Sequence, residues 1–237
     1  EYSLALLSIN GGGTTAAAAG VDSGLYVVDG TTALGQGESI YLYTSGSDIV
    51  GRIGSAGAAD SAGTIAFTIS VDSSANVTFT QAAGVNIYHP DATDPDDSVS
   101  LSLTNDGTFD FVIRLTQELT DADLDTDSAF VDLASSVSGQ AVGDFTIFDD
   151  GPTASVDSTA QSAAQSSAIS LEVDETAGQQ TNPKDTVDDR ESSADFSSLF
   201  TVDSGNASGN SAFGTDGANT NGTSNGIEYS LTLLSIN

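Results

Sequence analysis

Apolar and polar residues alternate along much of the chain, which is the pattern of half-buried β-strands. The clearest runs are residues 64–71, 76–81, 98–104 and 109–116, separated by turn-rich segments such as SSAN and TNDGT. Further strand candidates are residues 2–9, 39–44, 48–53, 129–134, 144–148, 169–173 and 198–202. The apolar faces of the clearest runs predict one shared core that buries Phe67, Ile69, Phe79, Leu101, Phe111 and Ile113.

This pattern predicts an all-β protein, because no segment has a convincing helical periodicity. Many short strands divided by turns are typical of a β-sandwich. We therefore expect Ig-like or Greek-key β-sandwich modules in a tandem array.

The array is predicted by an internal repeat. The decapeptide EYSLALLSIN at residues 1–10 returns as EYSLTLLSIN at residues 228–237, with nine of ten positions identical and a spacing of 227 residues from Glu1 to Glu228. The chain then holds one complete period and the first residues of the next, as a slice from a tandem array would.

Two polar segments set the expected domain boundaries. Residues 153–167 follow a Gly-Pro break and lack large apolar side chains, and residues 204–226 are rich in Gly, Asn and Ser. We expect a main module at 1–152, ending in DDGP, and at 153–237 a linker plus the N-terminal part of the next module. The closing decapeptide would either pair locally with residues 169–173 and 198–202, which we favour, or compete with Tyr2–Ile9 for the same place in the sheet.

The charge balance narrows the choice of partners. Thirty-four acidic residues face four basic ones, for a net charge of −30. Nucleic acid is excluded as a partner, because its binding requires clustered cations. No run approaches the roughly 18 to 20 apolar residues of a membrane span. The chain has no cysteine, so it has neither disulfides nor thiolate metal sites.

The densest acidic segment is ELTDADLDTDSAFVD at residues 118–132, in which Asp121, Asp123, Asp125 and Asp127 alternate with other residues. Calcium takes six to eight oxygen ligands, and spaced carboxylates on a turn can supply them. The segment is not an EF-hand, because its sixth position lacks glycine and its twelfth lacks glutamate. A calcium-binding turn is the sharper interpretation, and a solvated acidic turn is the alternative.

Three further acidic clusters are candidate metal sites. The first, HPDATDPDD, also holds the single histidine, His89, which we interpret as a structural hydrogen-bonding residue. The second, FDDGP, closes the main module, and the third, LEVDETAG, opens the next one, so the two could share an ion at the junction. The candidate ligands in these clusters are Asp94, Asp96 and Asp97, then Asp149 and Asp150, then Glu172, Asp174 and Glu175.

These motifs together resemble the tandem repeat of giant type I-secreted RTX adhesins of Gram-negative bacteria. The resemblance is carried, in this order, by SGLYVVDG, IVGRI, TIAFTISVDSSANVTFTQ, YHPDATDPDD, LTDADLDTDSA and FTIFDDGP, and it covers most of residues 1–152. LEVDETAG is similar to the segment that commonly precedes this repeat. Leu124 stands where the family more often has a glycine, which makes it harder for the turn to wrap an ion tightly.

The resemblance implies a secreted, cell-surface β-sandwich module that depends on calcium for stability and serves attachment and biofilm formation without catalysis. Its partners would be neighbouring repeats of the same chain. Three functions remain in competition: a structural extender, which we favour; a ligand-binding module that recognises glycans or a protein surface, for example through Tyr41 and Tyr43; and a hydrolase with paired carboxylates. The single histidine and the absence of a Gly-x-Ser-x-Gly motif count against the hydrolase.

Overall fold

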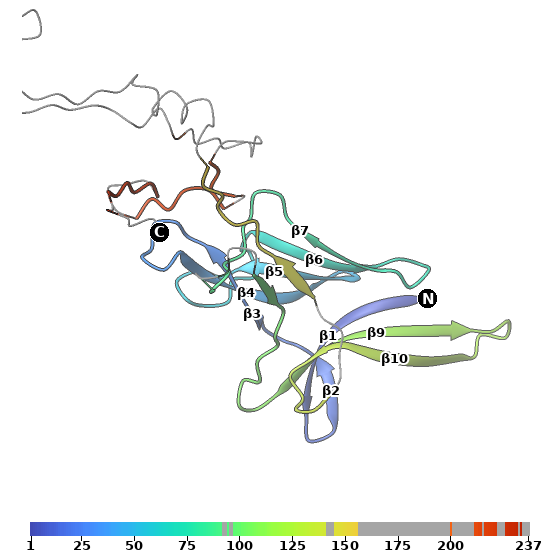
Figure 1. Ribbon diagram of the computed structural model, residues 1–237. Helices are drawn as coiled ribbons and strands as arrows, with labels where there is room; N and C mark the ends of the chain where they lie inside the picture. The colour runs from blue at the N-terminus through green and yellow to red at the C-terminus, as the bar shows by residue number, and fades with distance from the viewer. Residues whose placement is uncertain are drawn as a thin grey trace, which may run out of the picture. The chain divides into compact units, whose positions relative to one another are not determined.

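The computed structural model describes residues 1–91, 94, 97–140, 145–155, 200, 211–214, 216–221, 226–231 and 233 (Figure 1). The chain divides into two compact units, one of Glu1–Asp150 with Ala218–Asn237 and one of Gly151–Gly217. The described residues contain strands, turns and bends but no helix, which confirms the predicted all-β class. None of them therefore forms a helix that is long and apolar enough to cross a membrane.

The first sheet of the larger unit is antiparallel, with the strand order β10-β9-β1-β2. Its strands are β1 (Tyr2–Asn10), β2 (Gly13–Ala16), β9 (Asp110–Thr120) and β10 (Thr126–Ser135). β1 is an inner strand, since it pairs with β9 from Tyr2↔Gln117 to Ile9↔Asp110 and with β2 along its second half. β1 therefore adds a strand to the β9–β10 hairpin, which lies more than a hundred positions later in the sequence.

The second sheet is a meander of five strands in sequence order. It consists of β3 (Val21–Val28), β4 (Gln36–Ser45), β5 (Asp48–Ile53), β6 (Ile65–Val71) and β7 (Val77–Gln81). The chain after β7 returns to the opposite edge, where the amide of Val28 donates to the carbonyl of Asn86 at 2.9 Å and the amide of Tyr88 donates to that of Tyr26 at 2.8 Å. The sheet therefore curls back on itself.

A short pair of strands, β8 (Ser98–Ser100) and β11 (Thr146–Phe148), continues this edge. The amide of Ser102, just after β8, donates to the carbonyl of Ser23 in β3 at 2.8 Å. The pairing of β11 with β8 places the end of the module next to the strand that follows the His89 segment.

The core lies between the two sheets, as expected for a β-sandwich. Leu4 and Leu6 of β1 and Ile113 of β9 pack in one cluster with residues of the second sheet, among them Phe67 and Ile69. Four of the six predicted core residues, Phe67, Ile69, Phe111 and Ile113, are buried. Phe79 and Leu101 are only partly buried against the same cluster.

The structure adds two strands that alternation did not predict. All four residues of β2 are exposed, so its sequence has no apolar face from which a strand could be predicted. In β3, the pairing register with β4 shifts after Asp22 and again after Tyr26, and Gly24 has a φ of +72°. These irregularities interrupt the two-residue period on which the sequence prediction rests.

The closing decapeptide does not adopt the expected strand in its described part. Residues 228–231 and 233 are outside any strand, and Leu231 and Leu233 are completely exposed. The predicted local partners at 169–173 and 198–202 lie outside the described residues, except for Phe200. In the smaller unit, Thr153 and Ala212 form a bridge with two backbone hydrogen bonds of 2.9 and 2.8 Å.

Candidate metal centre

The densest acidic segment lies at the tip of the β9–β10 hairpin. β1 stops pairing with β9 at Gln117, whereas the β9–β10 ladder continues to Thr120↔Thr126. The hairpin therefore runs past the end of β1, with its turn at the free tip (Figure 1). The tip is exposed to solvent on all sides, from Glu118 to Val131.

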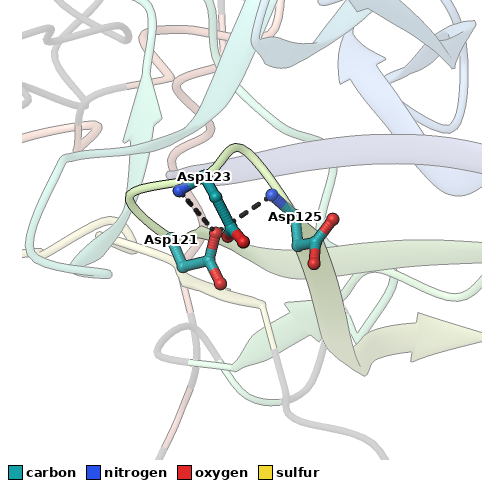
Figure 2. Close-up of side chains that lie close together, drawn as sticks. All are labelled: Asp121, Asp123 and Asp125. Atoms are coloured by element: carbon teal, nitrogen blue, oxygen red, sulfur yellow. Dashed lines mark hydrogen bonds between the residues drawn. The ribbon is translucent and has the colours of Figure 1, made fainter.

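Three of the four alternating aspartates meet at this tip. Asp121, Asp123 and Asp125 each offer a carboxylate oxygen, and these oxygens lie within 4.8 Å of one another. Among the residues that the structure describes, this trio is the only acidic group close enough to hold a metal ion. Figure 2 shows the three side chains gathered around the turn, with the amides of Asp123 and Asp125 directed at the carboxylate of Asp121.

Backbone hydrogen bonds fix the shape of the turn. Oδ1 of Asp121 accepts from the amide of Asp123 at 3.2 Å and from the amide of Asp125 at 3.0 Å. The amide of Leu124 donates to the carbonyl of Asp121 at 3.2 Å, and the amide of Asp121 donates to the carbonyl of Asp125 at 3.0 Å. Asp121 is therefore both the first ligand candidate and the residue that organises the turn.

Leu124 has a φ of +74°, in the left-handed region that favours glycine. The turn thus adopts a backbone that glycine permits more readily, although a leucine occupies the position. The leucine side chain is 78% exposed, so burial gives little compensation for the strained backbone. Leucine at this position therefore raises the energy of the turn.

The pKa of Asp121 lies below its usual value. A side-chain hydrogen bond with Asp123 is the main cause, and the amides of Asp125, Asp123 and Leu124 act in the same direction against a desolvation effect. Asp121 therefore keeps its charge to lower pH than an ordinary aspartate, which is the state that a cation requires.

A second hairpin turn in the molecule has the same backbone design, with Ser74 and Asn76 in place of Asp123 and Asp125. Between β6 and β7, Oδ1 of Asp72 accepts from the amides of Ser74 and Asn76 at 2.8 and 2.9 Å. Ala75, with a φ of +66°, takes the place of Leu124. The shared spacing, an aspartate followed four positions later by Asn or Asp between two alternating runs, is a signal that sequence reasoning had not used.

Asp127 lies apart from the trio. It is the second residue of β10, paired with Leu119 across the ladder, and its Oδ1 accepts from the amide of Ser128 at 2.9 Å. An extended chain would have put all four aspartates on one face. The tight turn instead separates the fourth from the other three.

The structure joins two acidic clusters that are far apart in sequence. Because β8 pairs with β11, Asp97 lies beside Asp149, whose amide donates to the Asp97 carbonyl at 2.9 Å. Oδ2 of Asp97 accepts from the amide of Asp91 at 3.1 Å, and Oδ1 lies 2.9 Å from Nδ1 of His89, although these two buried atoms do not meet hydrogen-bond geometry. Both His89 and Asp97 have largely buried side chains, which agrees with a structural role for the histidine.

The remaining candidates are dispersed or not described. Asp94 is exposed, and its amide donates to the carbonyl of Asp91 at 3.2 Å. The amide of Asp150 donates to Oδ1 of Asp149 at 2.8 Å, in the segment that follows β11. Asp96, Glu172, Asp174 and Glu175 lie outside the described residues, so the predicted junction site stays a prediction.

The trio at the hairpin tip can hold a metal ion. Its three carboxylates are hard oxygen donors on a preorganised turn, and their exposure leaves room for water as further ligands. Without a cation, three like charges within a few ångströms repel one another.

Comparison with known proteins gives a family and no named relative. A search of curated proteins and a search of solved structures returned no match. One family model matches residues 10–134, from the end of β1 to the last part of β10, and its description is "Domain of unknown function (DUF5801)". The matched segment includes both hairpin turns and spans more than half of the chain. The chain therefore belongs to the DUF5801 family.

Proposed function

We propose that this chain is a structural extender module of a large extracellular adhesin on the surface of a Gram-negative bacterium, where it supports attachment and biofilm formation. The observation that carries the proposal is the decapeptide that returns after 227 residues, a period that includes the β-sandwich and the smaller unit of Gly151–Gly217. A repeat of domain length adds length with each copy rather than a unique site. The partners of the module are then the neighbouring repeats of its own chain.

Calcium is the cation that we propose for the acidic turn. Asp121, Asp123 and Asp125 supply hard oxygen ligands, and the net charge of −30 makes the folded chain repel itself. A bound divalent cation would reduce this repulsion at the tip, where three carboxylates lie close together. Extracellular calcium modules bind with a Kd of about 0.1 to 1 mM, so the ion would be loaded outside the cell.

The test is thermal unfolding in millimolar calcium, in magnesium and in chelator. We expect calcium to raise the Tm of the chain, and the double variant Asp123→Ser with Asp125→Asn to lose that response. This variant converts DADLD to DASLN, which retains Asp121 and adopts the uncharged Ser and Asn of the turn that begins at Asp72. An equal Tm in calcium and chelator would rule out the calcium part of the proposal.

Extension itself is tested by small-angle scattering on chains of one, two and three repeats. A rigid extender predicts a maximum dimension that grows in proportion to the number of copies in calcium. Collapse of the three-repeat chain to the size of a compact globule, in calcium, would contradict the extender function even if calcium binding were real.

A ligand-binding module is the second candidate, and exposed apolar side chains on the β9–β10 hairpin favour it. Leu119, Phe130 and Val131 are 61%, 62% and 53% exposed on the strands that carry the acidic turn. Tyr41 and Tyr43, by contrast, are half-buried. The pKa of Tyr43 is raised, mainly by burial and in addition by the negative charge of the nearby Asp60. A glycan array compared between the chain and Leu119→Ser with Val131→Ser separates the candidates, since only a binding module loses signal.

A further inference from the structure

The same decapeptide occupies two opposite environments in this chain. As β1, it is an inner strand in which Leu4 and Leu6 are 3% and 1% exposed. In the second copy, Leu231 and Leu233 stand at the equivalent positions and are 105% and 100% exposed. A sequence that forms the centre of one sheet therefore presents its core-facing side chains to water.

The slot that β1 fills defines what the second copy would need. It has a ladder with β9 over eight residue pairs on one side and the β2 edge on the other. Below it lies the core cluster of the second sheet, which covers both leucines. Main-chain pairing and apolar contacts at alternate positions are the features by which a sheet accepts an added strand.

The one substitution between the copies is compatible with this slot. Ala5, which becomes Thr232, is half-buried and alternates with the two core leucines, so it lies on the other face of the sheet. It pairs with Arg114 across β9. Threonine is β-branched and suits a strand position of this kind.

We infer that Glu228–Asn237 is a second β1, and that its binding site is the slot between β9 and β2 in another copy of this domain. The copy is a separate chain or a following repeat in one polypeptide, because the slot is the same in both. The inference requires neither calcium nor an adhesive function.

Competition with the resident strand sets the expected occupancy. β1 is tied to β2 by Gly11 and Gly12 alone, and such a short connection gives an effective concentration in the millimolar range. At a chain concentration of about 0.1 mM, a nearly identical strand from a second chain should thus fill about a tenth of the slots.

Disulfide trapping tests this inference, because the chain has no cysteine of its own. Ser3 pairs with Thr116 in the β1–β9 ladder, and Ser230 is the equivalent of Ser3 in the second copy. Chains carrying Ser230→Cys and chains carrying Thr116→Cys are unfolded, mixed and refolded together under oxidation. We expect cross-linked dimers from about a tenth of the chains, in line with the occupancy above.

The matched control moves the acceptor by one residue. Gln117 is next to Thr116 but points to the opposite face of the sheet, so Ser230→Cys with Gln117→Cys should give only background cross-linking. Ser3→Cys with Thr116→Cys in one chain checks that the pair can form a disulfide. Equal dimer yields from the two acceptor positions would overturn the inference.

Damage to each copy in turn gives a second readout. Leu4→Glu with Leu6→Glu in the acceptor chain should raise the dimer yield several-fold, because its own strand no longer competes. Leu231→Glu with Leu233→Glu in the donor chain should reduce the yield to background. If the damaged acceptor stays unfolded despite an intact donor, the slot does not accept the second copy and the inference fails.

A lengthened chain shows whether the second decapeptide stabilises a following copy of the domain or the domain of its own chain. When residues 11–150 are appended after Asn237, Leu231→Glu with Leu233→Glu should lower the Tm of the added copy. The same pair of substitutions should leave the Tm of the original chain unchanged. Destabilisation of the original chain would show that the second copy already serves its own domain, contrary to the inference.

Discussion

Leu124 and Ala75 occupy the same place in two hairpin turns, with φ values of +74° and +66°. Each is the fourth residue of a turn that begins with an aspartate, whose Oδ1 accepts amides two and four residues later. One turn has serine and asparagine at those positions, and the other has two further aspartates. The fold thus contains a turn with three carboxylates and a counterpart with one, so the effect of the two additional charges can be tested directly.

Transplanting the acids should create a second cation site. Ser74→Asp with Asn76→Asp gives the turn at Asp72 the three carboxylates of the hairpin tip on a backbone of the same design. We expect the variant to bind an additional calcium ion by isothermal titration calorimetry. For each site that binds calcium in the folded chain alone, a hundredfold excess of calcium over Kd would add about 2.7 kcal/mol, or roughly 5 to 10 °C in Tm.

The control for this experiment is Ser73→Asp, which adds a charge at a position that does not correspond to one of the three. It should lower the Tm slightly in chelator and add no calcium site. A transplanted turn that binds no ion would mean that three carboxylates on this backbone are insufficient.

Replacing Leu124 with glycine should stabilise the acidic turn. A non-glycine residue in the left-handed region costs on the order of 1 to 3 kcal/mol, while glycine adds entropy to the unfolded chain of about 0.5 to 1 kcal/mol. We expect a net gain of between zero and about 2.5 kcal/mol in urea unfolding, and the same Tm response to calcium as in the parent chain. Leu119→Gly, in the regular part of β9, is the control and should destabilise the chain.

The ion pair of Arg114 and Asp132 should make stability depend on pH. Nε of Arg114 lies 2.7 Å from Oδ1 of Asp132, Nη2 lies 3.1 Å from Oδ2, and Nε2 of Gln140 donates to Oδ2 at 2.8 Å. The hydrogen bond from Arg114 is the main reason that the pKa of Asp132 is lowered, against desolvation and with help from Gln140.

The pKa of Asp132 is lower in the folded chain than in the unfolded chain. The charged Asp132 therefore stabilises the fold above the ordinary carboxyl pKa of about 4, and this stabilisation is lost as the pH falls through the folded pKa. Asp132→Asn should therefore cost about 1 kcal/mol at pH 7, a value that allows for partial solvent screening, and little at about pH 2. Urea unfolding at the two pH values measures this difference. An equal cost at both would mean that the pair contributes packing and not charge.

Truncation of corresponding leucines should have opposite outcomes in the two decapeptides. Leu6→Ala leaves a cavity in the core and should cost about 2 to 5 kcal/mol. Leu233→Ala removes a fully exposed side chain and should change the free energy of unfolding by less than about 0.5 kcal/mol at low concentration. Chemical denaturation of the two variants is the measurement, and equal losses would show that Leu233 is buried in solution.

Gly51 should not tolerate a methyl group. It pairs with Phe67 across β5 and β6, and an added Cβ would lie 2.5 Å from two atoms of the Phe67 ring. Gly51→Ala should destabilise the chain by about 1 to 3 kcal/mol through overpacking. Gly13→Ala, whose Cβ would have its nearest neighbour at 3.5 Å, should be nearly neutral. Thermal unfolding of the two variants measures the difference.

The sequence alone determined the class of fold and most of its strands. Alternation is a local property, so runs such as Ile65–Val71 specify both a strand and the face that it buries. The same reasoning placed Phe67, Ile69, Phe111 and Ile113 in the core. It also located the acidic segment between two strands, because turn residues interrupt the alternation there.

Only the tertiary structure decided which residues meet. Phe79 is half-buried because β7 is an edge strand, and Asp97 reaches Asp149 because β8 pairs with β11. The shape of one turn brings three aspartates together and separates Asp127 from them. The two decapeptides show that a local sequence does not determine burial. Leu6 is buried and Leu233 is exposed in nearly identical sequences, because burial depends on the strands and core residues that pack against a segment.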